Sequence, residues 1–95
     1  MLRNDRFEWD DRKAKRNARD HDVTFELACL VFDDAKAVDR LDLDESDEDR
    51  MLITGLVGDV LLTVCFVERV PRLRIISARK ATNREDDDYN EANAP

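Results

Sequence analysis

The stretch Leu73-Arg74-Ile75-Ile76-Ser77-Ala78-Arg79-Lys80-Ala81-Thr82 carries apolar and cationic side chains in one run and precedes an acidic segment. Its apolar and β-branched residues predict a strand. Strict alternation along that strand places Arg72, Arg74, Ile76, Ala78 and Lys80 on one face and Leu73, Ile75, Ser77 and Arg79 on the other. Neither face is purely apolar toward its end. We therefore expect Arg79 and Lys80 to lie near a surface site suited to a phosphate.

Other strands are indicated before this stretch. Residues 51–56 and 60–67 are rich in apolar and β-branched side chains and are joined across Val57-Gly58-Asp59, a connection typical of a hairpin. Residues 37–41 predict a short edge strand, and residues 2–9 resemble a short strand at the start of the chain. The acidic residues between 42 and 49 repel one another and predict a solvated loop.

Three helices are predicted from their capping residues and periodicity. Asp10 is placed to cap a helix over residues 11–20, and Asp22 follows where the chain needs a left-handed conformation. Thr24 is placed to cap a second helix, whose apolar stripe faces the core. Thr82 is placed to cap a final helix that ends near residue 92, with acidic residues in its first turns.

These elements predict a single α+β domain over residues 1–95. The expected architecture has two N-terminal helices, an antiparallel sheet of three to four strands and a C-terminal helix, with the helices packed on one face of the sheet.

Composition and charge bound the class of protein. The net charge of −7 opposes nonspecific binding of nucleic acid over the whole surface. Eleven of the sixteen cationic residues nevertheless fall in two segments, so a local basic groove is compatible with the sequence: Arg12, Lys13, Lys15, Arg16, Arg19, then Arg69, Arg72, Arg74, Arg79, Lys80, Arg84.

The sequence also predicts that the protein has no disulfide, metal site, cofactor or membrane segment. Cys29 and Cys65 lie in apolar runs without CxxC spacing, and we expect both to be reduced and buried. One histidine and no Cys/His cluster predict no metal site and no cofactor. The absence of a long apolar run or a signal-like start predicts a cytoplasmic protein without a membrane segment.

Cationic residues of this kind bind phosphate groups, and cleavage of RNA without a metal is one reaction in which they can serve. That reaction needs a base for the 2′-hydroxyl, an acid for the departing 5′-oxygen and cations for the charge on phosphorus. The candidates for the cationic role are Arg69, Arg74, Arg79 and Lys80, whose alternative role is in salt bridges with the many acids. We expect the guanidinium groups of Arg69, Arg74 and Arg79 to converge on one phosphate.

Two residues are candidate proton carriers. His21 is of the residue type most often used for general acid–base catalysis but lies at a helix end, where histidine often binds the last carbonyls instead. Glu68 is the second candidate. Tyr89 is placed either to contact RNA or to pack against the sheet, and Trp9 is more consistent with a core anchor than with stacking on a base.

Both ends of the chain resemble one family. Residues 73–82, together with Phe7-Glu8-Trp9-Asp10 and the spacing of Lys13, Asn17, His21, Val23 and Phe25, resemble the BrnT toxins, which are related to the RelE toxins. The resemblance implies a RelE-like fold and a ribonuclease activity that inhibits translation. It also implies a BrnA-like antitoxin that binds and neutralises the ribonuclease. The complex would contact DNA only through the antitoxin. By resemblance, Arg69, Arg79 and Tyr89 occupy places near the scissile phosphate. Arg74, Lys80 and Lys13 are candidate RNA-binding residues because of their charge.

The chain departs from the family pattern at two places. Asp20 and Asp22 stand where the family favours a basic residue and glycine, and Glu85-Asp86-Asp87-Asp88 follows where basic residues are common. An acidic last helix would repel RNA. A second hypothesis is therefore a non-catalytic protein-binding module on the same fold.

Overall fold

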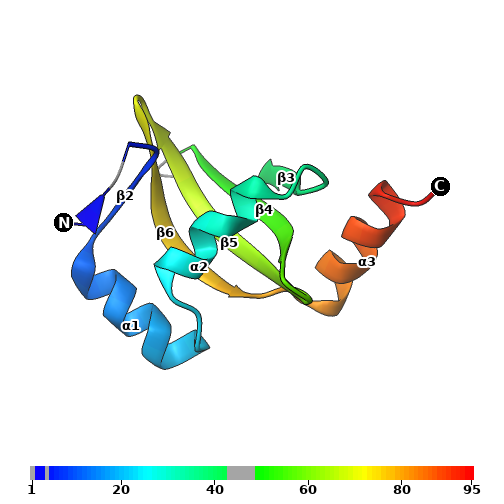
Figure 1. Ribbon diagram of the computed structural model, residues 1–95, viewed down its shortest axis with the longest axis horizontal. Helices are drawn as coiled ribbons and strands as arrows, with labels where there is room; N and C mark the ends of the chain where they lie inside the picture. Colours follow the sequence, from blue (N-terminus) through cyan, green and yellow to red (C-terminus); the bar gives the residue numbers. More distant parts are fainter. Residues whose placement is uncertain (1, 4, 43–48) are drawn as a thin grey trace.

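The computed structural model describes residues 2–3, 5–42 and 49–95 of the chain. Its helices and strands are, in chain order, β1 (Leu2–Arg3), β2 (Phe7–Trp9), α1 (Asp11–His21), α2 (Phe25–Leu30), a 3-10 turn η1 (Val31–Asp33), β3 (Val38–Leu41), β4 (Arg50–Val57), β5 (Val60–Arg69), β6 (Arg72–Lys80) and α3 (Asn83–Ala92). Figure 1 shows the long strands β4 to β6 crossing behind α2, with α3 set apart at the C-terminal end. The α+β class and the three predicted helices are confirmed.

The sheet is larger and differently ordered than predicted. Six strands pair in the order β1-β2-β6-β5-β4-β3, and β2 runs parallel to β6. The expectation of three to four purely antiparallel strands was therefore wrong. The sequence did not reveal the parallel pairing because β2 is three residues long and its partner, β6, lies more than sixty residues later in the chain.

The long hairpins follow the sequence pattern. The pairing of Val57 with Val60 leaves Gly58 and Asp59 as the turn, and Gly58 has a φ of 63°. Glycine adopts this left-handed conformation without a steric penalty. The predicted hairpin across this turn is confirmed, as is the edge strand within residues 37–41.

The helix caps also match their predictions. The Asp10 carboxylate accepts hydrogen bonds from the backbone N–H groups of Arg12 and Lys13, which lower its pKa. Asp22 ends α1 in the left-handed conformation, with a φ of 57°. The Thr24 hydroxyl accepts from Leu27 N–H at the start of α2. Local chemistry thus sets the helix boundaries.

The core lies between the sheet and the α2 segment. Phe25, Ala28 and Val31 are fully buried against Val64 and Ile75 of the central strands. Trp9 is 4% exposed and meets Phe25 edge-on, with ring centroids 5.8 Å apart, so its predicted role as a core anchor is confirmed.

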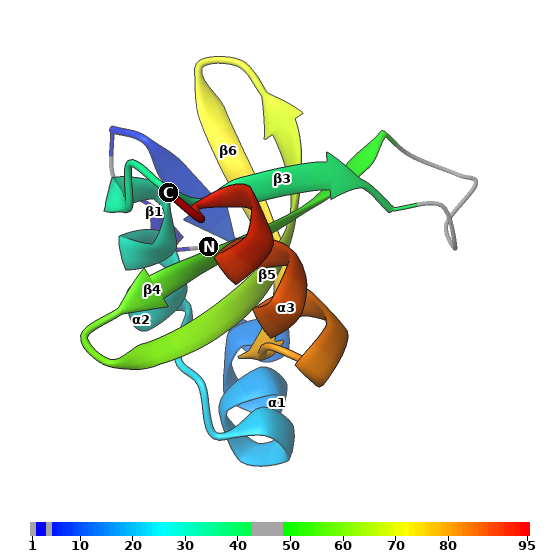
Figure 2. The same ribbon diagram turned by 90° about the vertical axis from the view of Figure 1, so that its right-hand side faces the viewer.

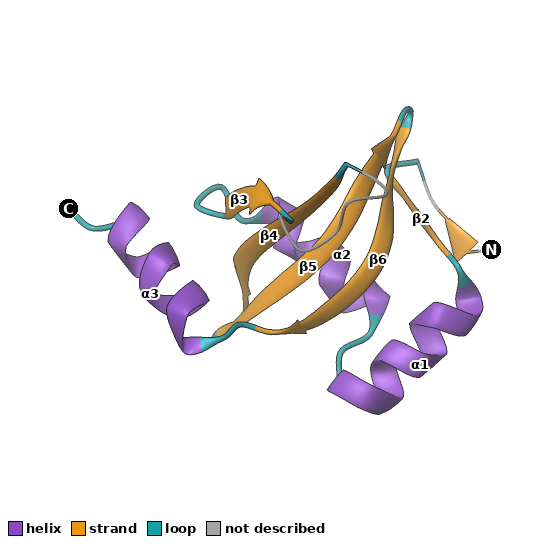
Figure 3. Cartoon of the chain, turned by 180° about the vertical axis from the view of Figure 1, so that it is seen from behind, coloured by secondary structure: helices purple, strands orange, loops and turns teal. Residues whose placement is uncertain are grey.

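The helices do not share one face of the sheet, so that expectation was wrong. In Figure 2, α3 lies in front of the strands, whereas α2 lies behind them. Figure 3 views the sheet from the side that α2 leaves uncovered, with α1 at its lower end. Through Glu85, α3 contacts Arg40 and Arg79 on this second face. We call this second side, which α2 does not cover, the open face. A functional site can form there.

Candidate functional site

A bulge in β6 decides which side chains line the open face. Cys65 pairs with Ser77, but the next residue, Phe66, pairs with Ile75, so Ile76 has no partner opposite it. Ile75 and Ala78 consequently both point into the core, at 1% and 0% exposure. The strict alternation predicted from the sequence was wrong, because a bulge shifts the phase of the strand.

The same shift gathers arginines on one face. Residues that pair directly across a sheet point to the same side. Side chains also alternate between the two faces along each strand. Applied from the Thr63–Arg79 and Val67–Arg74 pairs, the two rules place these arginines on the open face: Arg40, Arg50, Arg69, Arg72, Arg74 and Arg79. One face of the sheet therefore collects six of the arginines, although the chain as a whole is acidic.

Arg79 is engaged by a buried carboxylate. Its two terminal nitrogens donate to the two oxygens of Glu85 at 2.6 and 3.1 Å. Arg40 donates to the same carboxylate at 2.6 Å. Glu85 also completes a capping box with Thr82 at the start of α3.

The environment of Glu85 favours its charged form. Its side chain is 4% exposed, and burial alone raises the pKa of a carboxyl group. Hydrogen bonds from Arg79, Arg40 and the Thr82 backbone outweigh burial and hold the pKa of Glu85 well below its ordinary value. The negative charge of Glu85 is thus balanced by arginines of the protein itself. This acid of α3 therefore does not contribute to the expected repulsion of RNA.

Arg74 is paired at the other end of the strand. Its guanidinium donates to Glu8 of β2 at 2.9 Å, and the two side chains are 20% and 16% exposed. Arg74 and Arg79 share a face but bind separate carboxylates, so the expected convergence of these groups on one phosphate is not what the structure shows. Their roles toward RNA remain predictions.

Arg69, Arg72 and Glu68 lie at the hairpin that joins β5 and β6. Arg69 and Arg72 face each other across it on the open face. Glu68 lies two residues beyond the core residue Phe66 and points to the side of the sheet that bears α2. Glu68 is thereby separated from the arginines that it was predicted to assist.

A basic groove forms where α1 meets the open face. It has a volume of about 270 Å³ and is lined by Lys13, Arg16, Asn17, Asp20, His21, Arg50, Ile76 and Ser77. Three cationic residues and the one histidine of the chain thus border a single hollow. Of the residues predicted from the sequence, the groove unites Lys13 and His21.

Asn17 fixes α1 against β6 beside this groove. The Asn17 amide nitrogen donates to the carbonyls of Val23 and Ala78, and its oxygen accepts from Ala78 N–H, all at 2.8 to 3.0 Å. The side chain therefore replaces a neighbouring strand at the edge of β6 that β2 does not reach. It is 6% exposed. The position of Lys13 and His21 depends on this contact.

Tyr89 and Lys80 lie outside the groove. Tyr89 is buried and donates a 2.7 Å hydrogen bond to Asp34, which raises the pKa of the tyrosine. Burial raises the pKa of Asp34, but hydrogen bonds from Leu56 N–H, Tyr89 and Lys36 N–H bring it below its ordinary value. Lys80 pairs with Leu62 and shares its side of the sheet, away from the open face. Any role of either residue toward RNA remains a prediction.

The two cysteines form no disulfide with each other. Cys65 is buried as expected, but Cys29 is only half-buried, and burial raises the pKa of its thiol to about 11. The described part of the chain holds no cluster of metal-binding side chains. Residues 43–48 of the predicted acidic loop lie outside the described residues. No helix within the described ranges has the length and apolar character that crossing a membrane requires.

Sequence reasoning did not select Arg16, Arg40, Arg50 or Glu85 as site residues. The Thr82-x-x-Glu85 spacing is the sequence sign of a capping box, and it is the signal by which Glu85 can be found from the sequence. No local sign pointed to Arg40 or Arg50, because their place on the open face depends on pairing with distant strands.

Comparison with known families identifies one family for this chain. Residues 9–85 match the sequence model of a family described as "Ribonuclease toxin, BrnT, of type II toxin-antitoxin system". The match spans the helix that lines the groove, all the long strands and the start of α3. Among curated proteins, none matches this chain.

Proposed function

Because the chain belongs to the family of BrnT ribonuclease toxins of type II toxin–antitoxin systems, we propose that it cleaves RNA in the groove between α1 and the open face. The observation that carries this proposal is that three cations and His21 line one groove: Lys13, Arg16, Arg50. Asp20 is the one acidic residue among the described residues that line it. A phosphodiester needs cations at its oxygens and a base within reach of the 2′-hydroxyl, and this groove offers both.

The reaction requires no group from outside the chain except water. The His21 imidazole takes the proton of the 2′-hydroxyl, and the 2′-oxygen forms a bond to phosphorus. The bond from phosphorus to the 5′-oxygen breaks, and that oxygen takes a proton from water. The hydroxide that remains takes the proton from the His21 imidazolium, which restores both the base and the water. The products are a 2′,3′-cyclic phosphate and a free 5′-hydroxyl. Lys13, Arg16 and Arg50 balance the charge that develops on the phosphorane.

The groove favours His21 over Glu68 as the base. His21 borders the cationic residues, whereas Glu68 lies on the other side of the sheet. Arg69, Arg79 and Tyr89 remain candidate catalytic residues by resemblance, and Arg74 and Lys80 remain candidate RNA-binding residues. Arg79 enters the reaction only by exchanging Glu85 for a phosphate, because its guanidinium already binds that carboxylate at two points.

The family implies a partner. We propose that a BrnA-like antitoxin binds the protein in a heteromeric complex in the cytoplasm, prevents RNA cleavage and provides the link to DNA. Inhibition of translation then follows when the antitoxin is lost, because the freed chain degrades RNA.

The decisive experiment uses the purified chain without antitoxin on a single-stranded RNA. We expect cleavage to a 2′,3′-cyclic phosphate product by the wild type, and a loss of about 100-fold or more in His21→Ala. Lys13→Ala, Arg69→Ala and Arg79→Ala are compared in the same assay. Lys36→Ala is the control, since Lys36 is an exposed cation that does not line the groove.

One observation favours the second hypothesis, a non-catalytic module that binds only proteins. Arg74 and Arg79, two of the predicted RNA ligands, bind Glu8 and Glu85 within the molecule. Expression of the chain alone separates the two hypotheses, because a ribonuclease arrests growth in a manner that His21→Ala relieves, whereas a binding module leaves growth unchanged.

A further inference from the structure

The outer side of α2 presents apolar side chains to the solvent. Leu27 and Leu30 are 43% and 46% exposed, and their spacing of three residues places them on one side of the helix. Leu56, near the end of β4, is 41% exposed and borders a hollow together with Leu30. Figure 1 shows α2 lying over the long strands with its outer side uncovered. Exposed apolar side chains that lie next to one another mark surfaces that bind other molecules.

Hollows flank α2 along its length. One, of about 340 Å³, lies between α1 and the start of α2, and Trp9 is among its lining residues. Two more, of about 320 and 290 Å³, meet at Leu30 and Asp33, and extend toward β2 and toward the turn of the β4–β5 hairpin. A helix packed across Leu27 and Leu30 can therefore place side chains in hollows beside them. We call Leu27 and the residues that line these three hollows the α2 surface.

The α2 surface is acidic. The charged residues described around its hollows are five acids and two cations, which gives a net charge of −3: Asp5, Asp11, Glu26, Asp33 and Asp34, then Arg6 and Lys15. One of the cations, Arg6, pairs with Asp33 at 3.1 Å. Such a surface repels RNA, and it also repels the same surface of a second copy of the chain. A partner that binds here is expected to combine apolar and cationic side chains.

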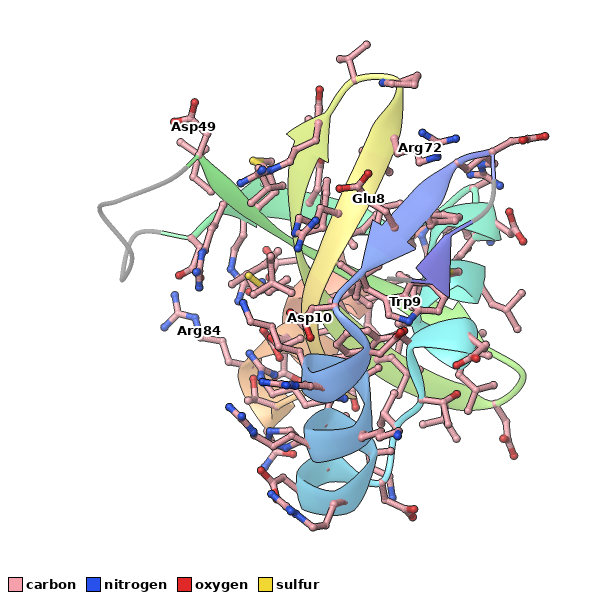
Figure 4. The ribbon with its side chains drawn as sticks, turned by 90° about the vertical axis from the view of Figure 1, so that its left-hand side faces the viewer. Glu8, Trp9, Asp10, Asp49, Arg72 and Arg84 are labelled. Atoms are coloured by element: carbon pink, nitrogen blue, oxygen red, sulfur yellow. The ribbon has the colours of Figure 1, made fainter. Side chains whose placement is uncertain are left out.

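The α2 surface and the RNA groove lie on different sides of the molecule. Within α1, Ala14 and Ala18 line a hollow of the α2 surface, whereas Lys13 lines the groove. In Figure 4, the neighbouring residues Glu8 and Trp9 lie on opposite sides of β2, with Trp9 toward α2. A partner seated on α2 therefore leaves the groove itself uncovered.

From this arrangement we propose that the α2 surface binds a basic amphipathic helix of the antitoxin. The apolar residues of that helix pack on Leu27, Leu30 and the hollows beside them, and its lysines or arginines lie against the surrounding carboxylates. The inference rests on the proposed function, which supplies the antitoxin. It separates two tasks, because this helix anchors the antitoxin and another segment of the antitoxin has to reach the groove to block RNA.

The test measures binding of a fluorescent helical peptide of leucine and lysine, with its leucines along one side of the helix. We expect the wild type to bind it. Leu27→Gln/Leu30→Gln should raise the dissociation constant roughly tenfold, because the apolar contact is lost. Glu26→Gln/Asp33→Asn should weaken binding roughly threefold at low salt and less at high salt. The amide resonances of Leu27 and Leu30 should shift on binding, whereas that of Ser77 in the groove should not.

Two controls separate this binding from a general attraction between opposite charges. Leu41→Gln/Val70→Gln removes two apolar side chains that are 61% and 90% exposed and line none of the three hollows, so it should bind like the wild type. A peptide of the same composition in which leucine and lysine alternate has no apolar side as a helix, and it should bind roughly tenfold more weakly. Equal affinity of the Leu27/Leu30 variant and the control variant overturns the inference. Equal affinity for the two peptides, or shifts centred on the groove, also overturns it.

The peptide assay does not depend on the cleavage assay. Leu27→Gln/Leu30→Gln should cleave RNA as fast as the wild type, since neither leucine lines the groove. Absence of cleavage by the wild type counts against the proposed function, whereas absence of peptide binding counts against the role of the α2 surface.

Discussion

Arg79 and Glu85 form a two-point ion pair that ties the last strand to the last helix. The guanidinium and the carboxylate meet at 2.6 and 3.1 Å, and Arg40 approaches the same carboxylate from β3. Glu85 therefore joins two strands and the start of α3. Since α3 buries only Glu85 and Tyr89, this ion pair is a main anchor of the helix.

The first prediction is that Glu85→Gln destabilises the protein. The substitution leaves two arginines without their shared counter-charge, but those arginines are 36% and 43% exposed, and water partly screens them. We expect the free energy of unfolding to fall by about 2 kcal/mol, measured by urea denaturation. Asp87→Asn, which changes the same charge at an exposed position of α3, should lie within about 0.5 kcal/mol of the wild type. Equal loss in both variants contradicts the anchoring role.

The second prediction concerns acid. The pKa of Glu85 is lower in the folded protein than in the unfolded chain, so its contribution to stability is complete above the unfolded value near 4.5 and is lost as the pH falls toward the folded pKa. The difference in unfolding free energy between the wild type and Glu85→Gln should therefore narrow steadily below about pH 4.5. A difference that stays constant from neutral pH to acid would show that the charge of Glu85 is unimportant.

The third prediction is that Asn17→Ala loosens α1. Removal of the amide leaves the Ala78 N–H and two carbonyls without their partner, and we expect a loss of about 3 kcal/mol in unfolding free energy. Hydrogen exchange at the Ala78 amide should become faster than at Phe66, which is also in the core. Unchanged exchange at Ala78 would mean that another group replaces the amide.

The fourth prediction separates the structural role of Tyr89 from a catalytic one. Tyr89→Phe removes the hydrogen bond to Asp34 and should lower the unfolding free energy by about 1 kcal/mol. We expect RNA cleavage by the folded variant to remain within about threefold of the wild type, because the phenol is buried and already engaged. A hundredfold loss of cleavage in a folded variant would support Tyr89 as a catalytic residue.

The fifth prediction is that His21→Gln affects the reaction more than it affects binding. Glutamine keeps a polar side chain at the groove but does not accept a proton, so cleavage should fall about 100-fold or more. The affinity for 2′-O-methyl RNA should change by less than about threefold, because the cations Lys13, Arg16 and Arg50 remain. Parallel losses in binding and cleavage would indicate that His21 holds the RNA and does not transfer a proton.

The amino-acid sequence by itself determined the local features of this protein. Asp10, Thr24 and Thr82 set the starts of the helices, Gly58 set a hairpin turn, and the apolar runs set the long strands. These features depend on residues within a few positions of one another, so they can be read along the chain. The resemblance of both ends of the chain to one family could also be recognised from the sequence, because each motif lies within a short stretch.

Only the tertiary structure decided which side chains share a face. The unpaired Ile76 shifts the phase of β6 and brings Arg74 and Arg79 to the same side, and the bulge exists only in relation to the partner strand β5. The parallel pairing of β2, the groove between α1 and Arg50, and the carboxylate partners of the arginines likewise join residues that are distant in the chain. Register between strands is a property of the pair, and one strand's sequence does not contain it.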